Sequence, residues 1–71
     1  MIVSIMSMMV IRKIDRELGD AKEDCLNGVD EARRLVSRTV IEYLEGWTPR
    51  LSYKERIEVL DYVEEEYGVA I

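Results

Sequence analysis

An apolar stripe with helical spacing runs through about half of this chain and predicts an α-helical fold. From Ile11 to Trp47 an apolar residue recurs every three or four positions, about 3.6 residues apart on average, which is the period of an α-helix. No proline interrupts this segment. The stripe comprises Ile11, Ile14, Leu18, Ala21, Cys25, Val29, Ala32, Val36, Val40, Tyr43 and Trp47. Because such a stripe must be buried against another apolar surface, we expect an all-α protein that packs helix against helix.

Two glycine-containing stretches within the stripe favour an interruption of the helix. Gly19-Asp20 followed by Glu23 has the spacing of a capping box, and Asn27-Gly28 followed by Asp30 combines a helix-ending glycine with a new N-cap. The stripe keeps its phase across both glycines, as one continuous helix would. However, that helix would be about 55 Å long, which is not compact for a chain of this size. We therefore expect a kink or break, at Asn27-Gly28 rather than at Gly19.

The boundary that follows the stripe is clearer. Gly46 can end the long helical segment, and Thr48-Pro49 cannot continue it, because proline lacks the amide hydrogen that a helix interior requires. Ser52 and Glu55 then have the spacing of a capping box, in which the two residues satisfy amide groups at the start of a new helix.

This new helix is expected to run from about Tyr53 to Tyr67 and to stop at Gly68. Val69 then folds back on the last turn, near Val63. The chain is accordingly expected to form a single domain, a small helical hairpin or bundle. Its parts are a long helical segment or two helices over 1–46, a turn over 47–52, a helix over 53–67 and a tail over 68–71.

The small size of the chain indicates that one copy does not complete its own core. Chains of fewer than ~70–80 residues are usually stabilised by disulfides, metals, oligomerisation or very regular helix packing. The chain has 71 residues, no histidine and a single cysteine, Cys25, so an intrachain disulfide is impossible. The opening stretch MIVSIMSMMVI is apolar nearly all round, and flexible Met side chains suit an adaptable helix contact. We expect a homo-oligomer, with a dimer favoured, whose interface uses Ile2, Ile5, Met6, Met9, Ile14 and Leu18.

The same opening stretch does not have the form of a targeting or membrane-spanning segment. Its basic residues, Arg12 and Lys13, follow the apolar run instead of preceding it, and no small-residue cleavage site comes after. Eleven residues are also well short of the ~20 that span a bilayer. A cytoplasmic location is expected, with a weak interfacial anchor or a later translation start as alternatives.

The residues that usually carry catalysis are scarce. Without histidine, Ser–His and Cys–His nucleophile pairs are excluded, and no glycine-rich phosphate loop occurs. Cys25 lies in the apolar stripe and is interpreted as a small buried hydrophobic residue. The acids at Glu42 and Glu45, and those of the last helix, lie mostly off the apolar faces, which is typical of solvated surfaces rather than metal ligands. We therefore expect no catalytic residues, no metal and no cofactor.

The last helix carries the candidate partner site. Its apolar face is expected to be Tyr53, Leu60, Val63 and Tyr67, flanked by Ile57 and Val59. Tyr62 is expected to point away from that face, beside a row of acids, and Glu64, Glu65 and Glu66 crowd the C-terminus, where the helix dipole disfavours anions. An exposed aromatic ring among acids is typical of a protein interface. The hypothesis is a non-enzymatic adaptor, inhibitor or antitoxin-like regulator that binds a basic protein surface through Glu58, Asp61, Tyr62 and Glu65.

Two other function classes remain open. A nucleic-acid-binding regulator would use the basic clusters Arg12, Lys13 and Arg16, or Arg33, Arg34 and Arg38, concentrated in a dimer. The net charge of −5 disfavours this class. So do acids at i, i+4 from the basic residues, which predict the ion pairs Lys13–Glu17, Arg16–Asp20, Asp30–Arg34 and Arg38–Glu42. The other class is a structural component whose function is assembly alone.

Overall fold

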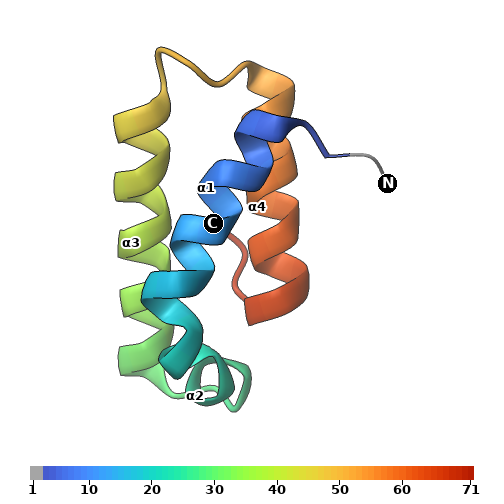
Figure 1. The fold of residues 1–71 in the computed structure, drawn as a ribbon. Coiled ribbons are helices and arrows are strands. Elements are labelled where there is room, and N and C mark those ends of the chain that lie inside the picture. Colours follow the sequence, from blue (N-terminus) through green and yellow to red (C-terminus); the bar gives the residue numbers. More distant parts are fainter. Residues whose placement is uncertain (1–2) are drawn as a thin grey trace.

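A computed structural model describes residues 3–71, and every regular element in this range is a helix, which confirms the all-α fold class (Figure 1). The elements are α1 (Ile5–Leu18), a short 3₁₀ helix η1 (Gly19–Ala21), α2 (Lys22–Leu26), α3 (Asp30–Trp47) and α4 (Tyr53–Tyr67).

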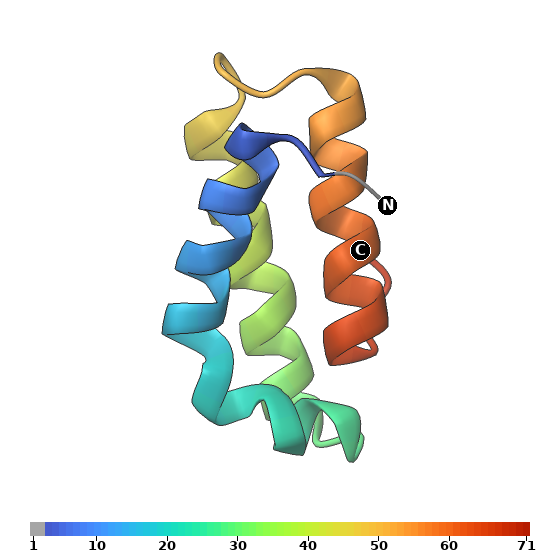
Figure 2. The ribbon, with the colours of Figure 1, turned by 45° about the vertical axis from the view of Figure 1, so that its right-hand side comes forward.

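The three longer helices lie side by side as a bundle, and α2 closes one end (Figures 1 and 2). Helices α1 and α4 run in the same direction and α3 runs in the opposite one. Helix α1 packs against both α3 and α4. The bundle measures 31 Å along its longest axis, so the apolar stripe cannot form one continuous helix of about 55 Å.

The chain changes direction at both glycine-containing stretches. Gly28 has a φ of +83°, a conformation that glycine adopts at little cost, and it separates α2 from α3. At Gly19 the α-helix tightens into η1, which redirects the chain into α2. The expected break at Asn27-Gly28 is confirmed, and Gly19 adds a kink.

The caps expected beside these two breaks are not formed. Neither η1 nor α2 has a side-chain cap, so the proposed pairing of Asp20 with Glu23 is wrong. Asp30 is the first residue of α3 rather than its cap, and Val29 occupies the N-cap position without a side-chain hydrogen bond. The acid of Asp30 lies instead in the first turn, where it complements the helix dipole.

The bounds of α4 agree with the prediction at both ends. The Ser52 hydroxyl accepts from the Glu55 amide at 3.1 Å, and the Glu55 carboxylate accepts from the Ser52 amide at 2.8 Å. Gly68 adopts the left-handed conformation with a φ of +71° and ends the helix. The tail then turns back, and Val69 is buried as expected.

The core follows the predicted stripe closely. Fully buried side chains come from all three long helices, and the C-terminal end of the stripe is only partly covered. Tyr43 and Trp47 are half-buried, and Val29 is exposed because it lies in the turn between α2 and α3. The buried apolar residues are Val10, Ile11, Ile14, Leu18, Cys25, Ala32, Val36, Val40, Leu51, Val59, Val63, Tyr67 and Val69.

Part of the proposed oligomer interface is used within the chain. Ile14 and Leu18 are buried in the chain's own core, because α1 is covered by α3 on one side and by α4 on another. They are therefore not available to a second copy, and this part of the prediction is wrong. Ile5 and Met9 are exposed and Met6 is half-buried, whereas Ile2 lies outside the described residues.

The prediction of i, i+4 ion pairs is also wrong. Within residues 3–71 the only ion pair joins two different helices, α2 and α4, through Lys22 and Glu66. An exposed i, i+4 pair gains little energy and must immobilise two long side chains, so the absence of such pairs costs the fold little.

Candidate interaction surface

Helix α4 is rotated relative to the expected orientation, and this rotation defines its exposed side. Glu55, Glu58 and Tyr62 face α1 instead of solvent, since each is within hydrogen-bond reach of an α1 side chain or of its N-cap. The expected apolar-face residue Tyr53 is consequently 77% exposed. Placing Tyr53 in the core was therefore wrong, because the buried side of α4 is centred on Val59, Val63 and Tyr67, and the polar contacts with α1 lie beside these residues.

Two of the four predicted partner-binding residues are held by these contacts. The Tyr62 hydroxyl donates to Asp15 at 2.6 Å, so the expectation that Tyr62 points away from the bundle is wrong. Glu58 is half-buried and accepts from the Ser7 hydroxyl at 2.8 Å. The other two residues, Asp61 and Glu65, are exposed as expected.

The outer side of α4 still combines apolar and acidic groups. Tyr53, Ile57 and Asp61 follow one another at i, i+4 steps, and Glu64 and Glu65 continue the same side of the helix towards its end. All five side chains are exposed, Ile57 to 38%. None of the three acids has an ion-pair partner within residues 3–71. We call these five residues the outer α4 face: Tyr53, Ile57, Asp61, Glu64 and Glu65.

Part of the acid crowding at the C-terminus of α4 is compensated from other helices. The Lys22 ammonium lies 3.0 Å from the Glu66 carboxylate and 5.4 Å from the centre of the Tyr67 ring. Arg33 donates to the carbonyl oxygen of Gly68 at 3.4 Å. These two cations satisfy Glu66 and the helix end, and they leave Glu64 and Glu65 directed at solvent.

Asp15 holds the inner side of α4 through two tyrosines, an arrangement that the sequence analysis missed. Tyr62 and Tyr67 each donate a hydrogen bond of 2.6 Å, one to each oxygen of the Asp15 carboxylate. Burial and the neighbouring carboxylate both raise the pKa of the two phenols. The sequence did place Tyr67 on the apolar face of its helix, and a buried tyrosine hydroxyl needs a hydrogen-bond partner, which could have pointed to this contact.

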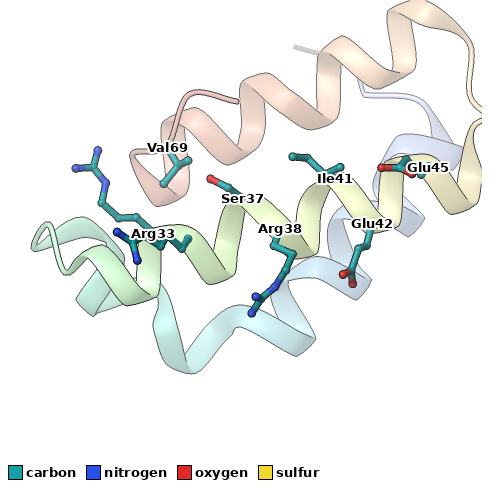
Figure 3. Close-up of a pocket in the computed structure, with 8 residues that line it drawn as sticks. Arg33, Ser37, Arg38, Ile41, Glu42, Glu45 and Val69 are labelled. Carbon is teal, nitrogen blue, oxygen red and sulfur yellow. The ribbon is translucent and has the colours of Figure 1, made fainter.

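The outer surface of α3 carries a groove with a volume of about 650 Å³ (Figure 3). Three arginines lie towards the N-terminal end of α3, two glutamates lie towards its C-terminal end, and Ile41 lies between them. Ile41 is 41% exposed. We call this feature the α3 groove; it is lined by Arg33, Arg34, Ser37, Arg38, Ile41, Glu42, Glu45 and Val69.

Cys25 has the surroundings of a structural thiol. It is buried, as predicted, and its Sγ atom donates to the carbonyl oxygen of Tyr67 at 3.1 Å. Burial raises the thiol pKa, with Arg33 opposing the shift, so the protonated form is favoured.

Neither a metal cluster nor a membrane-spanning helix is found over residues 3–71. No three acidic or cysteine side chains converge there as a metal site would require. None of the helices in that range is long and apolar enough to cross a bilayer.

No known protein family, curated protein or solved structure gives a significant match to this chain.

Proposed function

We propose that this protein is a non-enzymatic interaction module, which binds a basic and partly apolar protein surface through the outer α4 face. The observation that carries this proposal is the exposure of Tyr53 and Ile57 on the same side of α4 as three acids that have no ion-pair partner within residues 3–71. A tyrosine ring supplies a large contact area at low conformational entropy cost, and the acids further along the helix attract and orient a basic partner.

The electrostatics of α4 support the same proposal. Glu64 and Glu65 remain at the negative end of the helix dipole without a neighbouring base in the last turn. Their charges cost the isolated chain stability, and a bound lysine or arginine side chain would offset that cost. Tyr53 and Ile57 extend the surface towards the start of the helix, so the partner would contact both charged and apolar groups.

The proposal includes self-association. Ile5 is 80% exposed, and Met8 and Met9 are also exposed on the outer side of α1. Large apolar side chains grouped in this way are typical of a surface that is covered in an assembly. The same observation also supports a purely structural component, which would assemble but bind no other partner.

Charge reversal on the outer α4 face tests the proposal. A partner is first isolated with the wild-type protein, purified and measured by titration calorimetry. The double variant Asp61→Lys/Glu65→Lys should weaken binding at least tenfold, because both changes place cations against a basic partner. The matched control is Asp20→Lys/Glu23→Lys, which makes the same charge change on η1 and α2. Equal affinities of the two double variants would refute the role of the outer α4 face.

Nucleic-acid binding is a second candidate function. Arg33, Arg34 and Arg38 are exposed, and none forms an ion pair within residues 3–71, although neutralisation of Arg34 and Arg38 by neighbouring acids was expected. Unpaired arginines on one helix surface are typical of phosphate contacts. A gel shift on mixed duplex DNA at low salt tests this function. Absence of a shift at micromolar protein concentration would exclude nucleic-acid binding.

A further inference from the structure

We propose that the α3 groove is the self-association surface, and that its occupant is α3 of a second copy lying antiparallel across a two-fold axis. The proposal rests on the self-association in the proposed function and does not depend on which partner the outer α4 face binds. It assigns the two-fold contact to α3, and the exposed α1 residues Ile5, Met8 and Met9 lie outside that contact.

The charge distribution of the groove is self-complementary. Its basic end carries Arg34 and Arg38, and its acidic end carries Glu42 and Glu45. If a two-fold axis passes near the middle of residues 34–45, the order of charges is reversed in α3 of the second copy. Arg34 then lies opposite Glu45 of the second copy, and Arg38 lies next to its Glu42. Because a two-fold axis generates every contact twice, two such pairs in one copy become four in the dimer.

The centre of the groove fits close contact between two helices. Ile41 is large, apolar and 41% exposed, and Ser37 one turn earlier is small and half-buried. Antiparallel pairing places Ile41 against the aliphatic part of Arg38 of the second copy, which covers the isoleucine while the guanidinium reaches the acids. Val69 extends the apolar floor on the side nearest the tail (Figure 3).

The isolated chain leaves these charges unsatisfied, which favours a second copy over other occupants. Arg34, Arg38, Glu42 and Glu45 form no ion pair within residues 3–71. Glu45 lies in the last turn of α3, which contains no basic residue, so the helix dipole disfavours its charge. A basic or acidic peptide would satisfy only one end of the groove, whereas a second copy satisfies both.

A charge-swap experiment tests this geometry. The variant Arg34→Glu/Arg38→Glu makes all four paired positions acidic and leaves Arg33 unchanged, and Glu42→Arg/Glu45→Arg makes all four paired positions basic. Each variant alone should lose the dimer, because like charges then face each other across the axis. An equimolar mixture should recover it as a heterodimer, since every pair is again of opposite charge. All four substituted positions are exposed on α3, where a change of side chain has a small effect on stability, so the variants should fold.

Sedimentation equilibrium measures the outcome, and circular dichroism checks the fold. The wild type and the mixture should have twice the monomer mass of 8.3 kDa at micromolar concentration, and each variant alone should have the monomer mass. A monomeric wild type would overturn the proposal. So would a dimer that persists in both variants, which would place the interface elsewhere, for example at Ile5 and Met9. None of the four substitutions touches the outer α4 face, so failure here leaves the partner-binding test intact.

Discussion

The hydroxyl of Tyr67 donates a hydrogen bond of 2.6 Å to the carboxylate of Asp15, which lies 52 positions earlier in the chain. Tyr62 donates to the other carboxylate oxygen at the same distance. This shared acceptor joins the end of α1 to the second half of α4. It turns Tyr62 inward and thereby leaves the outer α4 face to Tyr53, Ile57 and the acids.

Removing either partner of these hydrogen bonds should destabilise the fold. Tyr67→Phe removes one charge-assisted hydrogen bond and should lower the free energy of unfolding by about 1–3 kcal/mol. Asp15→Ala should cost more than Tyr67→Phe, because it leaves two tyrosine hydroxyls without their acceptor. Urea denaturation followed by circular dichroism measures both effects. Tyr53→Phe is the matched control, and its exposed hydroxyl should contribute little. Equal stabilities of all three variants would contradict the role of Asp15.

Stability should fall at high pH. The folded state raises the pKa of Tyr62 and Tyr67 above the ordinary tyrosine value of 10.0, mainly through burial. The folded state therefore holds these protons more tightly than the unfolded state does. The two protonated tyrosines therefore stabilise the fold fully below pH 10, and this stabilisation is lost as the pH rises towards their raised pKa in the folded state. The urea midpoint should thus decline above pH 10, and the double variant Tyr62→Phe/Tyr67→Phe should decline less. An identical decline would show that other groups cause it.

Two glycines should respond in opposite directions to alanine. Gly28 has a φ of +83°, so Gly28→Ala should destabilise the protein by about 1–2 kcal/mol. Gly19 has a φ of −52°, and a methyl group there meets no neighbouring atom within 4 Å in the described part of the chain. Gly19→Ala should therefore stabilise by about 0.4–1 kcal/mol. Thermal melts of the two variants provide the comparison. The same sign for both would contradict the backbone conformations described for these turns.

Cys25 should resist modification in the folded protein. Its side chain is buried, and burial raises the thiol pKa, so little reactive thiolate is exposed. Alkylation by iodoacetamide at neutral pH should be at least tenfold slower than in urea, as measured by mass spectrometry. Labelling at the unfolded rate would show that Cys25 is accessible in the native state.

Features encoded by neighbouring residues were predictable from the sequence, and the rotation of α4 was not. The Ser52–Glu55 cap and the helix-ending Gly68 are local devices, and both were located correctly. The inner side of α4 depends on Asp15, which lies 47 and 52 positions from its two tyrosines. The sequence of α4 alone cannot indicate that Tyr62 is hydrogen-bonded to Asp15 in α1. Periodicity therefore placed Tyr62 outside and Tyr53 inside, the reverse of the structure.

What covers α1 was likewise not predictable from the sequence. Its apolar residues showed that it would be buried, but not whether another copy or its own chain would cover it. Ile14 and Leu18 are covered by the chain itself, while Ile5 remains exposed. Helical spacing alone places seven of the eight lining residues of the α3 groove on one side of α3, whereas the position of Val69 beside them depends on how the tail packs.

Photo-crosslinking from Tyr53 tests the central claim most directly. A photoreactive phenylalanine analogue replaces Tyr53 in one variant and Leu35, on α3, in a second variant as the control; Leu35 is 38% exposed. The purified partner is added, the mixture is irradiated, and the crosslinked products are quantified by mass spectrometry. We expect the Tyr53 variant to crosslink to the partner and the Leu35 variant not to do so. Crosslinking from Leu35 alone, or equally from both positions, would contradict binding through the outer α4 face.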